Sequence, residues 1–179
     1  MNNENPNVFP QNDIEKLPNS FYSHAEAIYH LSEVGIEVKQ TRVADWLGVS
    51  RANVSQVIGR MQNSGLIELS DNLLLTEKGS YLAKMISRRR RIIERFLSEI
   101  LDLPWDQVYK ETKKWENVLS PVTEDSMLKI LGNPTTGIFG NPIPYSGYFE
   151  GPMKRLLDVK VNKKYNIVKI SEELKKDSS

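Results

Sequence analysis

The sequence predicts a mainly α-helical chain that begins with a winged helix-turn-helix. A short helical pattern over residues 41–47 ends at Gly48, and a second one, over residues 51–63, starts after Ser50. Two short apolar runs, separated by the turn residues Ser70, Asp71 and Asn72, follow at once. Two helices joined by a tight turn and followed by a hairpin are the parts of a winged helix-turn-helix. Most of the remaining apolar periodicity is helical.

The composition bounds the function classes. The chain has 179 residues, of which 39% are hydrophobic and 26% are charged, which is typical of a globular protein with one or two domains. Its net charge of +1 gives no global electrostatic argument for nucleic acid, so any such argument must rest on local clusters. The absence of cysteine excludes disulfides, thiol catalysis and cysteine metal sites. No apolar run is long enough for a membrane span and the N-terminus is unlike a signal peptide, so we expect a cytoplasmic protein with no membrane partner.

The pattern divides the chain into elements in a clear order. Residues 1–17 contain Asn and Pro with little periodicity, which predicts a flexible arm. The expected elements are helices at about 20–34, 41–47 and 51–63, strands at 66–69 and 73–76, and helices at 77–101, 104–118 and 120–131. Three Gly and three Pro between Gly132 and Pro144 predict a loop, and "YNIVKI" (165–170) predicts a late strand.

The third helix has two unlike faces. Its apolar stripe consists of Val54, Val57, Ile58 and Met61. Its polar side chains are Arg51, Asn53, Ser55, Gln56 and Arg60, and Ser50 precedes them as the expected N-cap. Arg can pair bidentately with guanine, Asn or Gln can pair with adenine, and Ser and first-turn N–H groups suit phosphates. The alternative is a solvated helix face. With the turn and the wing in sequence, we favour double-stranded DNA as the partner over a winged helix that binds only proteins.

From His24 to Pro144 the chain resembles the iron-dependent repressor family, that of the diphtheria toxin repressor and the manganese transport regulator. The matching stretches are "IYHL", "VSQVIGRMQNSGLI", "LLTEKG", "WENVLS" and "FGNPIP". The resemblance implies a winged helix-turn-helix (residues 18–84), then a helical dimerisation and metal-sensing domain (85–145). Residues 146–179 resemble a linker and the opening of the family's small SH3-like domain, which is incomplete here.

The resemblance also implies a homodimer that represses transcription from a palindromic operator, with two recognition helices about one helical turn of DNA apart or a multiple of it. The family's DNA-contacting positions fall on Arg42, Ser50, Ala52, Asn53 and Gln56, and we add the wing residues Asp71 and Asn72. Ala52 can offer a base only a methyl contact, so the operator cannot be copied from relatives. Metal-responsive repression and a protein-interaction module are the alternative functions.

Members of this family bind Fe²⁺, Mn²⁺ or similar ions through His, Glu and Asp, with Cys or Met in some. Most of these positions are changed here. The resemblance leaves Glu94 and Glu116 as remnants of the metal site, whereas the other family ligands fall on Ser23, Arg90, Tyr109, Lys113 and Asn117. Two carboxylates without imidazole make a poor transition-metal site.

Two of the replacements introduce a fixed cation. Arg90 and Glu94 are spaced i,i+4, and Lys113 and Glu116 are spaced i,i+3, so each pair can meet on a helix. One hypothesis is that the guanidinium and ammonium groups occupy the space of the ions and hold the DNA-binding arrangement. The other is that they form surface salt bridges of about 0–1 kcal/mol at sites that decayed. Either way we expect no required cofactor, with weak binding of Mn or Fe as the alternative.

The remaining clusters suggest no further chemistry. The run "SRRRR" (87–91) could contact phosphate, but we favour a solvated, salt-bridged helix in which Arg88, Arg91 and Arg95 share a face. His24 and His30 are six residues apart and share no helical face, so they form no chelate. No catalytic triad, nucleotide fingerprint or carboxylate–histidine cluster is present, and the chain is therefore not expected to be an enzyme.

Overall fold

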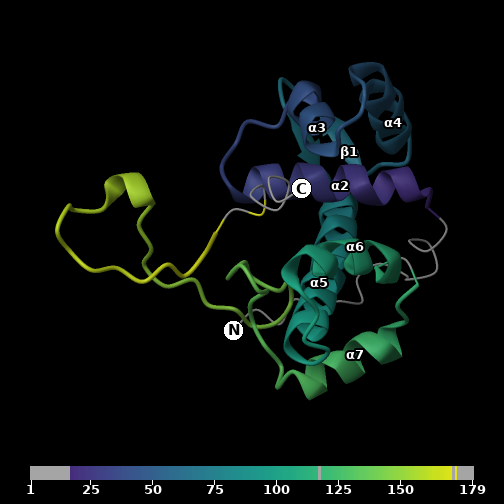
Figure 1. Cartoon of the computed structure of the whole chain (residues 1–179). Coiled ribbons are helices and arrows are strands. Elements are labelled where there is room, and N and C mark those ends of the chain that lie inside the picture. Colours follow the sequence, from purple (N-terminus) through teal and green to yellow (C-terminus); the bar gives the residue numbers. More distant parts are fainter. Residues whose placement is uncertain (1–16, 117, 171, 173–179) are drawn as a thin grey trace. The chain divides into compact units, whose positions relative to one another are not determined.

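The computed structural model describes residues 17–116, 118–170 and 172. The predicted N-terminal arm therefore lies outside the described residues, apart from Leu17. The elements are α2 (Asn19–Glu33), α3 (Gln40–Leu47), α4 (Arg51–Asn63), β1 (Ile67–Leu69), β2 (Leu73–Leu75), α5 (Glu77–Glu99), α6 (Trp105–Trp115), α7 (Pro121–Ile130) and the 3₁₀ turn η1 (Leu156–Asp158) (Figure 1). The predicted helices and the hairpin are confirmed, with small shifts at their ends. The chain forms two compact units that divide between Arg88 and Arg89.

The turn between α3 and α4 follows from two residues. Gly48 adopts the left-handed conformation with φ 65° and ψ 34°, which a residue with a Cβ adopts only at a cost. Ser50 then caps α4, because its hydroxyl accepts a hydrogen bond from the backbone N–H of Asn53 at 3.2 Å. The tight turn and the N-cap predicted from the sequence are both confirmed, and together they fix where α4 begins.

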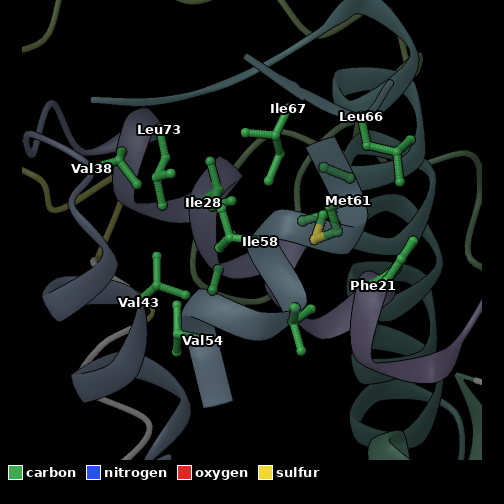
Figure 2. Close-up of a cluster of buried hydrophobic side chains, with 14 of the residues drawn as sticks. Phe21, Ile28, Val38, Val43, Val54, Ile58, Met61, Leu66, Ile67 and Leu73 are labelled. Atoms are coloured by element: carbon green, nitrogen blue, oxygen red, sulfur yellow. The ribbon is translucent and has the colours of Figure 1, made fainter. Parts of the chain in front are cut away.

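The apolar stripe of α4 packs into the core of the first unit. Val54, Ile58 and Met61 are at most 1% exposed. Figure 2 shows these side chains beside Ile28 of α2 and Val43 of α3, with Ile67 and Leu73 of the hairpin close by. Burying one such side chain contributes about 1.5–3 kcal/mol, so this stripe sets which side of α4 faces inward.

The hairpin is joined firmly to the helices. Strands β1 and β2 pair antiparallel with Glu68 opposite Leu74. The N–H of Leu73 donates to the carbonyl of Val38 at 2.8 Å, which ties β2 to the segment before α3. At the start of α5 the Thr76 hydroxyl donates to the carbonyl of Gly65 at 2.7 Å. The wing is therefore held at both of its ends.

The second unit has a separate apolar core. The residues come from the later turns of α5, from α6, from the segment between α6 and α7, from α7 and from the loop that follows: Ile92, Ile93, Leu97, Val108, Leu119, Met127, Leu128 and Ile143. The predicted loop between Gly132 and Pro144 is confirmed, and its two sides meet in a single antiparallel bridge between Thr136 and Pro142.

The late strand predicted at residues 165–170 is wrong, because the structure assigns no strand there. Between residues 146 and 170, η1 is the one regular element among the described residues (Figure 1). Apolar side chains of this stretch stay exposed, among them Leu157 at 93% and Ile167 at 78%. A strand is stable only beside partner strands that bond its backbone and cover its apolar face. The described residues provide no such ladder for this stretch, and the opening of the SH3-like domain is not formed in them. No helix in the described ranges is long and apolar enough to cross a membrane.

Candidate nucleic-acid interface

Helix α4 presents a polar face to solvent above its buried stripe. All six side chains of α4 that we predicted to contact DNA are exposed: Arg51, Ala52, Asn53, Ser55, Gln56 and Arg60. At about 100° per residue, Ala52 and Gln56 lie opposite the buried stripe, and Arg51 and Asn53 lie toward its two edges. The middle of the outward face therefore consists of a methyl group and an amide.

The N-terminus of α4 adds donors to this face. The first N–H groups of a helix have no partner within the helix, and the helix dipole makes this end positive. Ser50 satisfies one of them through the Asn53 N–H. Arg42, on the first turn of α3, is also exposed. This combination of backbone donors, a cap hydroxyl and guanidinium groups suits phosphate oxygens.

Arg60 has a structural contact that the sequence did not indicate. Its guanidinium carbon lies 5.3 Å from the centre of the Phe21 ring of α2, within the range of a cation–π contact. Arg60 is nine positions after Arg51, which places it roughly 14 Å further along the helix. Arg60 therefore joins α4 to α2 at the end of the helix away from the turn.

The tip of the wing is closed by a local hydrogen-bond network. The hydroxyl of Ser70 donates to the carbonyl of Asn72 at 2.8 Å and accepts from the N–H of Asn72 at 3.2 Å. Asp71 is exposed at this tip. Its carboxylate would repel a phosphate, so of the two predicted wing residues Asn72 has the more suitable chemistry for a DNA backbone.

The arginine run on α5 differs from its prediction. Arg90 and Arg91 are not solvated, since their side chains are only 6% and 1% exposed. The Nη2 atom of Arg90 and the Nε atom of Arg91 each lie 2.9 Å from a carboxylate oxygen of Glu172, which is 5% exposed. Buried charges require an opposite charge with good geometry. The acid that satisfies them comes from the far end of the chain.

The second unit contains other ion pairs. Lys113 and Glu116 form the predicted i,i+3 pair at 3.1 Å. Arg89 lies 3.5 Å from a carboxylate oxygen of Glu124 and donates to the backbone carbonyl of Glu116 at 3.2 Å. Arg95 pairs with Glu99 at 2.7 Å. The salt-bridged part of the prediction for this helix is thus confirmed, and the solvated part is wrong for Arg90 and Arg91.

The residues on which we predicted the family's metal ligands make a poor donor set for a transition-metal ion. Glu94 is buried and Glu116 lies against Lys113. Within the described ranges no three His, Cys, Asp or Glu side chains are grouped so that they could hold an ion. Both histidines of the chain lie on α2, so residues 76–145 contain neither imidazole nor thiolate. The ammonium group of Lys113 beside Glu116 would further repel a divalent ion.

The two histidines have other partners. His24 is buried, and its Nδ1–H donates to the carbonyl of Ser20 at 2.7 Å. Burial lowers the pKa of His24, which the hydrogen bond to Ser20 partly opposes. His30 stacks on Trp46 of α3 with ring centres 5.8 Å apart, and its Nδ1 lies 3.3 Å from Glu33. They support the packing of α2 and form no chelate.

The capped, exposed helix and its wing place the chain in the class of winged helix-turn-helix proteins. Residues 23–73 match the model of the iron-dependent repressor N-terminal DNA-binding domain, and residues 76–145 match that of the iron-dependent repressor metal-binding and dimerisation domain. The chain belongs to the iron-dependent repressor family. This is a family of transcriptional repressors, so the prediction that the chain is not an enzyme is confirmed.

Individual relatives agree with this assignment. The iron-dependent repressor IdeR of Mycobacterium tuberculosis is 39% identical over 133 residues, which are 73% of this chain and 58% of the relative. The diphtheria toxin repressor of Corynebacterium diphtheriae is 35% identical over 123 residues, or 68% of this chain and 54% of the relative. The chain thus spans little more than half the length of these relatives.

Solved structures show the same fold. The manganese regulator SloR superposes with a TM-score of 0.64 at 29% identity, over 74% of this chain and 62% of that one. The metal-dependent transcriptional regulator MtsR gives a TM-score of 0.66 at 29% identity, over 70% and 60% of the two chains.

Proposed function

We propose that the chain is a cytoplasmic, homodimeric transcriptional repressor that reads a palindromic operator with two copies of α4. The observation that carries the proposal is the outward face of α4, which starts at a capped helix N-terminus and lies opposite a fully buried stripe. A dimer with two-fold symmetry would place the two helices in successive major grooves. The matches to a DNA-binding domain and to a dimerisation domain support this arrangement.

Within this face we assign different roles to different residues. Gln56, in the middle of the face, reads an adenine, and the methyl of Ala52 contacts a thymine methyl. Arg51 and Asn53 read the flanking bases, and Arg42, Ser50 and Ser55 contact phosphates. Arg60 and the wing residue Asn72 contact the backbone further out, and Asp71 shapes the wing tip.

We further propose that operator binding needs no divalent metal. The support is chemical: Arg90 and Lys113 stand at ligand positions, and both lie against carboxylates. A cation that is part of the chain cannot dissociate. The affinity for the operator would therefore not depend on the concentration of metal ions. The alternative is a metal-responsive repressor with unorthodox ligands such as Glu94 and Glu116. The match to a metal-binding domain and the names of the relatives favour that alternative.

One experiment tests these statements together. The chain is used to select its operator from random duplexes, and the affinity is then measured in EDTA, in Mn²⁺ and in Fe²⁺ at fixed salt. We expect specific binding of a dimer, with equal affinity in all three buffers and a steep dependence on salt. A strong gain on adding metal would support the metal-responsive alternative. Equal affinity for operator and random duplex would favour a protein-interaction module.

The variant Gln56→Ala tests the base-reading role. We expect a loss of about 1–3 kcal/mol that is confined to one base pair of each half-site. Gln62→Ala is the matched control, because Gln62 is exposed on the same helix but lies near its C-terminal end. A uniform weakening across all sequences would instead assign Gln56 to the DNA backbone.

A further inference from the structure

The chain carries a buried anion site that includes Arg90, one of the two cations on which the proposed metal independence rests. Arg90 and Arg91 are adjacent on α5, and both donate to the one carboxylate of Glu172 from 2.9 Å. Arg90 uses Nη2 toward Oε2, and Arg91 uses Nε toward Oε1, so each carboxylate oxygen accepts from a different guanidinium. Arg91 also donates through Nη1 to the carbonyl of Pro142. Two guanidinium groups thus converge on one carboxylate, and the bond to Pro142 fixes the orientation of the Arg91 side chain.

The segment that delivers Glu172 docks by its backbone as well. We call Val168, Lys169, Ile170 and Glu172 the strap. The N–H of Ile170 donates to the carbonyl of Phe139 at 2.9 Å, and the side-chain amide of Asn141 donates to the carbonyl of Ile170 at 3.1 Å. Asn141 is itself buried. The strap is therefore held by hydrogen bonds at two of its peptide groups, in addition to the contacts of its carboxylate with the arginines.

One glycine allows this close approach. Gly140 has a φ of +77°, and a Cβ at this position would lie 1.8 Å from the carbonyl oxygen of Val168 and 2.8 Å from its carbonyl carbon. No side chain fits in that space. The loop between Thr136 and Pro142 thus provides a seat shaped for the strap, although the two segments are distant in sequence.

We propose that Arg90 and Arg91 form a carboxylate-binding site in the second unit, and that the strap is its built-in ligand. Two neighbouring guanidinium groups buried at 6% and 1% exposure would be strongly unfavourable without an anion between them. The strap supplies that anion from within the chain. This inference goes beyond the proposed function and holds whether or not α4 reads an operator. Residues 76–145 match a domain that is described as binding metal. In this chain the group bound by Arg90 and Arg91 is instead a carboxylate of the chain itself.

The first test removes the ligand and returns it from solution. In the variant Glu172→Ala of the 179-residue chain the lost atoms are those of acetate. We expect the Tm to fall by roughly 5–10 °C in sodium chloride and to recover in sodium acetate of equal ionic strength. The unchanged chain should respond equally to both salts. If the variant does not fold in sodium chloride, folding in sodium acetate would support the proposal in the same way as a recovered Tm. An unchanged Tm, equal effects of the two salts, or recovery on adding MnCl2 would each overturn the proposal.

The second test blocks the seat and leaves the carboxylate in place. The variant Gly140→Ala places a methyl group against Val168, and Gly147→Ala is its control. Gly147 has nearly the same positive φ, +74°, but a Cβ there would meet nothing within 4 Å. We expect hydrogen exchange at the Ile170 amide to accelerate about tenfold in Gly140→Ala only. Equal exchange in the two variants would show that the strap is not seated on this loop.

Discussion

Helices α4 and α5 both carry a run of polar and basic side chains, yet the two runs have opposite environments. The polar side chains of α4 are exposed, and its apolar stripe fills the core of the first unit. On α5, Arg90 and Arg91 are 5% and 1% exposed, so they are buried almost as deeply as the apolar Ile92 and Ile93 that follow them. The difference teaches that a basic run on a helix does not by itself mark a surface. Its environment depends on whether acids from other segments reach it.

The largest expected effect separates these two environments directly. Replacing Arg91 with Ala removes one of the two guanidinium groups that pair with the buried carboxylate of Glu172, so we expect a loss of about 3–5 kcal/mol in the free energy of unfolding. Replacing Arg51 with Ala removes an exposed charge, and stability should change by no more than about 0.5 kcal/mol. Urea unfolding of both variants measures this. Equal losses of stability would contradict the conclusion that the basic side chains are buried on α5 and exposed on α4.

The next effect concerns two glycines, one on each helix. A Cβ at Gly79 of α5 would lie 2.0 Å from the carbonyl oxygen of Leu66, whereas a Cβ at Gly59 of α4 would meet nothing within 4 Å. We expect Gly79→Ala to destabilise the chain by about 1–3 kcal/mol, because the backbone must move apart. Gly59→Ala should stabilise it by about 0.5–1 kcal/mol, since Ala favours a helix interior. Thermal unfolding of both variants would show whether the two signs differ.

The sequence was sufficient wherever the determining contacts are local. The periodicity of Val54, Ile58 and Met61, the cap at Ser50 and the turn at Gly48 all act within a few residues, and each is found as predicted. The Lys113–Glu116 pair is local too. Such features depend on helix geometry, which a spacing rule captures.

What the sequence did not reveal depends on distant partners. Glu172 is 81 residues from Arg91, and no spacing rule links them. The burial of the arginine run therefore could not be predicted, and neither could the seat at Gly140. The prediction of a strand at residues 165–170 was wrong for the same reason. The sequence shows the alternation of this stretch, but it does not show whether another strand lies beside it, and the described residues provide none.

A third prediction compares matched caps in the two units. Ser50 accepts from the N–H of Asn53 at 3.2 Å, and Ser120 accepts from the N–H of Thr123 at 3.3 Å. Each Ser→Ala change should lower the free energy of unfolding by about 1 kcal/mol. Only Ser50→Ala should also weaken DNA binding, because only that cap belongs to the proposed interface. Unfolding curves and gel shifts of both variants would show this, and equal losses of DNA affinity would contradict the assignment of the face.

The smallest effect at neutral pH comes from His24, a buried histidine of the first unit. Burial lowers the pKa of this imidazole below 6.5, so the unfolded chain takes up a proton at a higher pH than the folded chain does. The contribution of His24 to stability is therefore fully present above pH 6.5 and is lost as the pH falls through the window between 6.5 and the lowered value. The variant His24→Gln does not titrate, and its unfolding free energy should fall less steeply over that window. Identical pH slopes for the two proteins would show that the imidazole takes up its proton without leaving the core. In that case the core of the first unit would accommodate a buried charge, as the second unit does at Arg90 and Arg91. The two units would then no longer differ in this respect.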